Sequence, residues 1–242
     1  MSIKSTYRYI RIGCIWLMAL VSGRKLSELS EHTLIVAPHP DDEAFGCGGL
    51  IRTLIEEGKK VSVVILTQGE KSLQDYDKNE VIEARKKMTL DTASVLGVRD
   101  IFWAGMEDGN IRNSNPGQLY DIINKVNPHA VFIPHYQEGW SDHEAAEKIV
   151  LDFIRKRKQN IKCYHYCVWL WFSMPYSGFK KVKWKDARVL KMKESVYEKK
   201  LKTIEIYMNS KNREGKPYSG VLPHEFLYAN SRKKELFFEI NY

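Results

Sequence analysis

The chain has 242 residues, which is long for one domain but usual for an α/β fold. Its 43% apolar and 28% charged residues are ordinary for a folded globular protein and exclude a disordered chain. The four cysteines form neither a disulfide framework nor a CxxC pair, so we expect reduced, buried thiols and a cytoplasmic setting.

Residues 1–32 form a basic and apolar extension ahead of a single domain at 33–242. Residues 10–21 are mostly apolar, but a membrane span needs about 20 apolar residues, and no convincing cleavage site follows. We therefore expect a helix packed on the domain. The alternative is a peripheral anchor at the inner face of the membrane, because basic flanks beside Trp16 and Leu17 suit a membrane surface.

The first chemical cluster lies between a predicted strand at 33–36 and a predicted amphipathic helix at 43–57. It contains one imidazole and two adjacent carboxylates, at the carboxyl end of a strand, where α/β sheets bind ligands. His39 and Asp42 can turn toward one point and chelate a metal. Asp41, which leaves the same turn in another direction, is free to transfer a proton.

Strands and helices alternate through the rest of the chain. The strands are expected at 61–67, 100–104 and 130–134, and the helices at 79–96, 119–126 and 142–158. An aromatic strand at 163–172, a basic helix and a strand at 235–240 follow. This order predicts an α/β single-domain Rossmann-like three-layer sandwich, with a mostly parallel sheet and helices on both faces.

A second cluster at 135–143 occupies the same structural position, between a strand and a helix. His143 alone could simply begin a surface helix, but both clusters follow strands and are expected to meet. His39, Asp42 and His143 would give zinc three protein ligands and leave one position for water, whose proton Asp41 can accept. Asp142 is placed to hydrogen-bond a neighbouring imidazole. Zn²⁺ is the expected metal, and Fe²⁺ also suits these ligands.

Residues 37–43 resemble the signature of the PIG-L/LmbE-like zinc de-N-acetylases, which remove acetyl groups from N-acetylglucosamine-type sugars. Weaker similarities to the family extend the resemblance from about residue 33 to 149, and they lie at 67–70, Arg85, 96–98, 108–109, 132–135 and 142–143.

The resemblance implies metal ligation by His39, Asp42 and His143, with Asp41 as general base. It also implies a set of substrate-binding residues, namely Arg85, Glu70, Asp108 and His135. For Arg85 and Glu70, a simple surface ion pair is the alternative.

One position departs from the family pattern. Trp140 stands where many members have a histidine that is thought to stabilise the oxyanion or protonate the amine, and an indole can do neither. His135, His224 or the metal alone would have to substitute.

Three other features have structural explanations beside functional ones. The glycine-rich run at 46–49 lacks dinucleotide-loop order and predicts close packing of a helix on the sheet. The aromatic run at 164–172 suits either sugar stacking or a strand covered on both faces. Residues 180–202 contain ten basic and three acidic residues, so this segment carries +7 of the chain's net +8.

That basic segment suits a solvated helix face, an anionic substrate or an acidic membrane. We expect no nucleic-acid partner, because no reading helix or RNA-binding motif accompanies it.

The expected function is metal-dependent hydrolysis of the acetamide of an N-acetylglucosamine-type sugar. The expected substrate is an anionic conjugate in which this sugar is linked to a lipid, a nucleotide or a polysaccharide. One alternative is a hydrolase of another N-acyl amide. The other is a catalytically weak sugar- or membrane-binding relative, for which Trp140 is the only hint.

Overall fold

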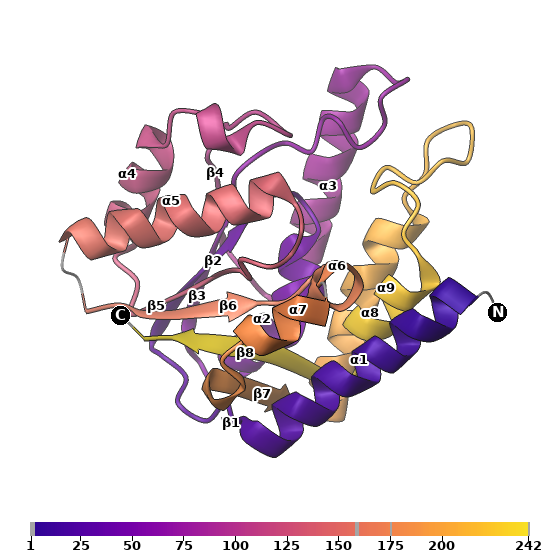
Figure 1. Cartoon of the computed structure of the whole chain (residues 1–242). Coiled ribbons are helices and arrows are strands. Elements are labelled where there is room, and N and C mark those ends of the chain that lie inside the picture. The colour runs from indigo at the N-terminus through magenta and orange to yellow at the C-terminus, as the bar shows by residue number, and fades with distance from the viewer. Residues whose placement is uncertain (1–2, 158–159, 175, 242) are drawn as a thin grey trace.

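The computed structural model describes residues 3–157, 160–174 and 176–241. Its described residues build one eight-stranded sheet, in the order β1-β7-β8-β6-β5-β2-β3-β4 (Figure 1). The strands are β1 Arg24–Lys25, β2 His32–Ala37, β3 Lys60–Ile65, β4 Asp100–Trp103, β5 Ala130–Pro134, β6 Lys162–Tyr166, β7 Ala187–Lys191 and β8 Lys234–Ile240. The sheet and its covering helices confirm the predicted α/β class.

Five neighbouring strands, β6-β5-β2-β3-β4, run parallel. β2 lies at their centre, where Thr33 is in register with Val61 of β3 and Ala130 of β5. The chain builds outward from β2 first through β3 and β4, and then on the opposite side through β5 and β6. The gap between the carboxyl ends of β2 and β5 is therefore a topological switch point, where such sheets bind ligands.

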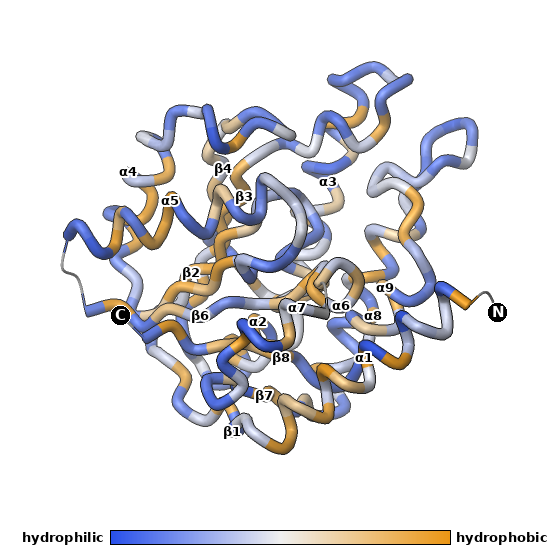
Figure 2. Tube along the Cα trace, in the orientation of Figure 1, coloured by the Kyte–Doolittle hydropathy of each residue, from blue (hydrophilic) through white to orange (hydrophobic). Residues whose placement is uncertain are grey.

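Helices cover both faces of the sheet because side chains alternate along the strands. Leu34 packs with α4 (Gly117–Val126) and α5 (Ser141–Arg157), whereas Ile35 packs with α2 (Asp42–Glu56), α3 (Lys78–Leu96) and α8 (Glu194–Asn209). The apolar segments in Figure 2 follow these strands and the helix faces against them. The predicted helix at 142–158 corresponds to α5, and Lys158 lies outside the described residues.

The basic segment is not the single helix that we expected. It starts at the end of α7 (Tyr176–Lys181), passes through η2 (Trp184–Asp186) and the strand β7, whose Ala187, Val189 and Leu190 are buried, and continues as α8. β7 pairs antiparallel with β8, and β8 pairs antiparallel with β6. The sequence did not indicate this strand, because its few buried apolar residues lie among long basic side chains.

The predicted aromatic strand at 163–172 is also wrong in its second half. β6 ends at Tyr166, and residues Leu170–Ser173 form the short helix α6. The cause is the buried Glu138 carboxylate, which accepts hydrogen bonds from the backbone amides of Val168 and Leu170 at 3.1 Å. Amides held in this way cannot pair with a neighbouring strand.

Helix α1 (Ile3–Ser22) packs on the domain, as expected, through Ile12, Ile15, Trp16 and Ala19. The indole of Trp16 stacks on that of Trp171 with ring centroids 5.3 Å apart. Among the described helices, none is long and apolar enough to cross a membrane. The remaining elements are η1 Ile111–Asn113, α7 Tyr176–Lys181, η2 Trp184–Asp186 and α9 His224–Asn230.

The glycine-rich run lies inside α2 and allows close packing, as predicted. A β-carbon at Gly46 would come within 2.9 Å of the Tyr166 ring, and one at Gly49 within 3.0 Å of the Met192 methyl group. Because α2 follows the β2 loop directly, this packing fixes where the first chemical cluster lies.

Candidate active site

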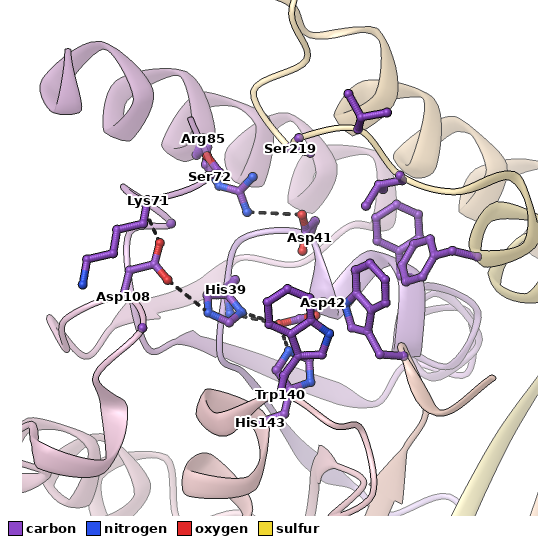
Figure 3. A pocket seen from close by; sticks show the side chains of 18 of the residues that line it. His39, Asp41, Asp42, Lys71, Ser72, Arg85, Asp108, Trp140, His143 and Ser219 are labelled. Carbon is purple, nitrogen blue, oxygen red and sulfur yellow. Dashed lines mark hydrogen bonds and ion pairs between the residues drawn. The ribbon is translucent and has the colours of Figure 1, made fainter. Parts of the chain in front are cut away.

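Three potential ligand atoms converge at the switch point between β2 and β5. His39 comes from the turn that joins β2 to α2, Asp42 is the first residue of α2, and His143 comes from the first turn of α5. Oδ2 of Asp42 lies 3.3 Å from both Nδ1 of His39 and Nε2 of His143 (Figure 3). The structure thus brings together the three side chains expected from two clusters a hundred residues apart.

The His39 ring is held so that Nδ1 faces this group. Its other nitrogen, Nε2, lies 3.2 Å from Oδ2 of Asp142 and 3.3 Å from Oδ1 of Asp108. Asp142 is itself fixed by the backbone amides of Gly109 and Ile111, which donate to its two oxygens. Asp142 therefore contacts an imidazole, as expected, and this imidazole is that of His39.

His39, Asp108 and Asp142 form a second group that could hold a metal ion. Its two carboxylates already accept backbone hydrogen bonds, including one from Lys71 to Asp108 at 2.8 Å. The first group offers two imidazoles and one carboxylate, the donor set typical of catalytic zinc. On donor chemistry, the group of His39, Asp42 and His143 therefore fits a zinc-like cation better.

Glu138 is a part of the site that the sequence did not reveal. It is completely buried, and Oε2 lies 3.6 Å from Nδ1 of His143. The Nδ1 atom has no hydrogen-bond partner among the described residues. A carboxylate behind a ligating imidazole commonly orients the ring and raises its basicity. Nothing in the local pattern separated Glu138 from an ordinary loop residue.

The ligand group is electrostatically suited to a cation. Although burial opposes it, contacts with Asp42 raise the pKa of His143 to about 9. Burial also lowers the pKa of His39, but the contacts with Asp108, Asp142 and Asp42 outweigh burial and raise that pKa well above its ordinary value. The two imidazoles hold the pKa of Asp42 well below its usual range, despite burial. Surroundings that favour protons on two imidazoles also favour a bound metal ion in their place.

Asp41 lies beside the ligand group and faces the pocket (Figure 3). Its backbone has φ of 119°, in the left-handed region, and its amide donates to Oε2 of Glu43 at 2.9 Å. Burial raises the pKa of Asp41 to about 6, while Arg85, whose Nη2 lies 3.2 Å from Oδ2, lowers it. Strained backbone of this kind is typical of functional positions.

Arg85 is a buried residue of the site and not part of a surface pair. Only 3% of it is exposed, and it donates to the carbonyls of Pro40 and Tyr218 as well as to Asp41. Gly69, after β3, makes room for it, since a β-carbon there would overlap Nε and lie 3.0 Å from Cζ.

The other predicted residues divide between the pocket and its surroundings. Asp108 lines the pocket, whereas Glu70 lies behind it and accepts a hydrogen bond from the Asp108 amide at 3.1 Å. His135 does not line this pocket; it is buried against His165 and Phe238, with ring centroids 5.0 and 5.1 Å away.

The pocket has a volume of about 460 Å³ and two unlike walls. The polar wall carries Asp41, Arg85, Asp108 and Lys71. The opposite wall is apolar and aromatic, and consists of Phe45, Trp140, Trp169, Val221, Leu222 and Phe226. No residue of 180–202 lines the pocket, so the basic segment forms no part of its walls.

Comparison with known proteins agrees with this arrangement. The model of the PIG-L family, described as GlcNAc-PI de-N-acetylase, matches residues 34–154, which is half of the chain. The chain is 30% identical over 134 residues to a probable N-acetyl-alpha-D-glucosaminyl L-malate deacetylase 2 of Bacillus cereus. That match covers 51% of this chain and 60% of the relative, so it spans less than two thirds of the relative's length.

Two solved structures share the fold at low sequence identity. N,N'-diacetylchitobiose deacetylase from Pyrococcus horikoshii superposes with a TM-score of 0.61 at 20% identity, over 82% of this chain and 73% of that one. GalB, the 4-carboxy-2-hydroxymuconate hydratase from Pseudomonas putida, gives 0.59 at 18% identity, over 82% of each chain. The fold thus occurs with more than one reaction, and the reaction must be argued from the site.

Proposed function

The chain belongs to the PIG-L family, and we propose that it is a metal-dependent hydrolase that removes the acetyl group from an N-acetylglucosamine-type sugar. The observation that carries the proposal is the convergence of His39, Asp42 and His143 beside Asp41, on the floor of a pocket. The deacetylase names of the Bacillus cereus and Pyrococcus horikoshii proteins support the reaction type.

His39, Asp42 and His143 would hold the metal ion, for which zinc is the first choice and ferrous iron the second. A divalent cation bound there polarises the acetamide carbonyl and lowers the pKa of water. Glu138 and Asp142 keep the two imidazoles oriented, because each contacts the ring nitrogen that points away from the ligand group.

Asp41 would act as general base. A water molecule adds to the acetamide carbon, and Asp41 accepts the proton that the water loses. The C–N bond then breaks, and the protonated Asp41 returns that proton to the leaving nitrogen, so that acetic acid and the amine are released and ionise to acetate and ammonium. A carboxyl whose pKa lies near 6 can take and return a proton close to neutral pH.

Arg85 would position Asp41 and not react itself. Its guanidinium fixes one carboxylate oxygen at 3.2 Å and is anchored by the carbonyls of Pro40 and Tyr218. This leaves the other oxygen of Asp41 for the reacting water. Neither His135 nor His224 lines the pocket, so the metal alone would take over the role of the histidine that Trp140 replaces.

The two unlike walls suit a sugar. The apolar faces of a pyranose ring can lie on Trp140 and Trp169, whose ring centroids are 5.3 Å apart, while hydroxyl groups face Asp108 and Lys71. Lys71 is at the open side and already pairs with Glu107 at 3.1 Å. It is the pocket's best contact for an anionic group linked to the sugar.

The test is release of free amine and acetate from a panel of lipid-, nucleotide- and malate-linked N-acetylglucosamine conjugates, with and without a chelator. We expect chelator-sensitive release from at least one conjugate, and a loss of about 10²- to 10⁴-fold in kcat for Asp41→Asn at unchanged zinc content. Zinc-loaded protein that hydrolyses N-acyl amides but no N-acetyl sugar would contradict the substrate class. Full activity of Asp41→Asn would contradict the mechanism.

A further inference from the structure

Helix α1 carries apolar side chains on two opposite faces. One face is buried against the domain through Ile12, Ile15, Trp16 and Ala19. The other is a stripe at spacings of three and four residues, which places its members on one side of a helix. We call it the α1 stripe, and it consists of Ile3, Tyr7, Ile10, Cys14, Leu17 and Val21. Ile3 is 90% exposed and Val21 is 74% exposed, so the α1 stripe faces outward.

An apolar groove runs beside the stripe. It has a volume of about 580 Å³ and lies between α1 and the segment of α7 and η2. Its apolar lining comes from Ile10, Leu17 and Met18 on one side and from Phe179, Val182 and Trp184 on the other. Exposed apolar surface of this extent marks an interaction site and is not typical of a free surface.

Four lysines lie in the same segment as Val182 and Trp184: Lys180 lines the groove, and Lys181 and Lys183 line a neighbouring pocket. Lys180, Lys181, Lys183 and Lys185 are all exposed, whereas Val182 and Trp184 between them are buried. Val182 and Trp184 therefore line the groove, while the four lysines around them are exposed to solvent. None of the four lysines forms an ion pair within the described part of the chain.

We propose that the α1 stripe, the groove and these four lysines bind the surface of an anionic phospholipid bilayer. Apolar side chains flanked by unpaired lysines match the layered chemistry of such a surface, with acyl chains below and phosphates at the level of the ammonium groups. Because its inner face is packed on the domain, α1 lies along the bilayer and does not enter it end-on. The four lysines outnumber Asp186, the single acidic residue of 180–186, and this excess of positive charge favours anionic lipid over a protein partner of mixed charge.

Flotation with vesicles of phosphatidylcholine alone, or with one third phosphatidylglycerol, tests the proposal on the full chain. We expect the wild type to float with the anionic vesicles and to partition about a hundredfold less onto the neutral ones. The quadruple variant Lys180→Gln, Lys181→Gln, Lys183→Gln and Lys185→Gln should lose about 10²- to 10³-fold in partitioning onto the anionic vesicles, since each lysine near an anionic surface contributes about fivefold. The double variant Leu17→Gln and Val21→Gln should also release the protein.

Matched controls use exposed side chains elsewhere on the surface. Leu90→Gln removes an apolar side chain that is 48% exposed on α3. A control quadruple variant changes the exposed Lys86, Lys148, Lys156 and Lys199 to Gln. Both controls should float like the wild type.

A second readout uses Cys14, which is exposed on the stripe while the other three cysteines are buried. An environment-sensitive fluorophore on Cys14 should shift to the blue with anionic vesicles only. No flotation at low salt, or flotation lost equally in the controls, would overturn the proposal. So would a wild-type dimer that only the Leu17→Gln and Val21→Gln variant abolishes, because that result assigns the surface to a second copy of the chain.

Discussion

Gly69 lies against Arg85 so closely that a β-carbon at position 69 would overlap Nε and come within 3.0 Å of Cζ. Gly69 also has φ of +66°, a conformation that other residues adopt only at a cost. The loop after β3 thus admits the guanidinium that fixes Asp41, and Gly69 is expected to matter for activity as well as for folding.

Gly69→Ala should lower the free energy of unfolding by about 1 to 3 kcal/mol and kcat by at least tenfold. The loss of kcat follows because the displaced Arg85 no longer positions Asp41. Gly58→Ala is the matched control, since Gly58 has φ of +73° and nothing within 4 Å of an added β-carbon. Urea denaturation and amine release measure both effects. Equal losses of kcat in the two variants would contradict the role assigned to this contact.

Glu138→Gln should weaken both the local fold and the metal site. The carboxylate accepts hydrogen bonds from the backbone amides of Val168, Trp169 and Leu170. A glutamine side chain at this position has only one oxygen that can accept them. We expect a loss of about 2 to 3 kcal/mol in the free energy of unfolding. The dissociation constant for zinc should rise by about 10- to 100-fold, because His143 loses its orienting partner.

Glu147→Gln is the control for Glu138. Glu147 contacts an imidazole too, with Oε1 at 3.1 Å from Nε2 of His165, but neither residue lines the pocket. Zinc titration by calorimetry should give the wild-type constant for Glu147→Gln. An unchanged constant for a folded Glu138→Gln would show that Glu138 supports only the backbone of α6.

Trp140→Ala should raise KM for a sugar substrate by about tenfold and leave kcat nearly unchanged, because a stacking surface binds ground state and transition state alike. Tyr136→Ala is the control, since Tyr136 is 38% exposed and lies outside this pocket. Steady-state kinetics distinguish the outcomes. A large loss of kcat at constant KM would instead place Trp140 at the reacting atoms.

His135 should make the fold sensitive to acid. Burial and the nearby His165 hold the pKa of His135 well below its ordinary value of 6.5. Above pH 6.5 the ring is neutral in both states and has no effect on stability. Below it the unfolded chain binds a proton that the native ring does not, so the free energy of unfolding falls by up to about 1.4 kcal/mol per pH unit.

Urea denaturation from pH 7 to pH 5 measures that slope. It should become shallower in His135→Gln and stay unchanged in His129→Gln, which alters an exposed histidine. An identical slope in the wild type and His135→Gln would mean that His135 is protonated in the native state.

The parallel half of the sheet was predictable because burial on both faces leaves mostly apolar strands, such as Val61 to Ile65, in which Ser62 is the one polar residue. The ligand group was predictable for a related reason. His39 and His143 each follow a strand, and parallel strands bring such positions to one edge. Spacing and polarity, which can be read directly from the sequence, are enough to predict this convergence.

The remaining parts depend on tertiary contacts that no local pattern encodes. In the sequence, Glu138 looks like any other loop carboxylate. In the fold it is buried behind His143, and the backbone amides that donate hydrogen bonds to it end β6. β7 was missed because Arg188 and Lys191 accompany its buried residues. His135 lies in the same cluster as His143, yet the chain turns it away from the pocket toward Phe238.

The most direct test is an anomalous difference map at the zinc edge from zinc-loaded crystals. A single peak is predicted within about 2.0 to 2.2 Å of Nδ1 of His39, Oδ2 of Asp42 and Nε2 of His143, with Asp41 unligated beside it. A peak bound by His39, Asp108 and Asp142, or none at stoichiometric zinc, would contradict the account.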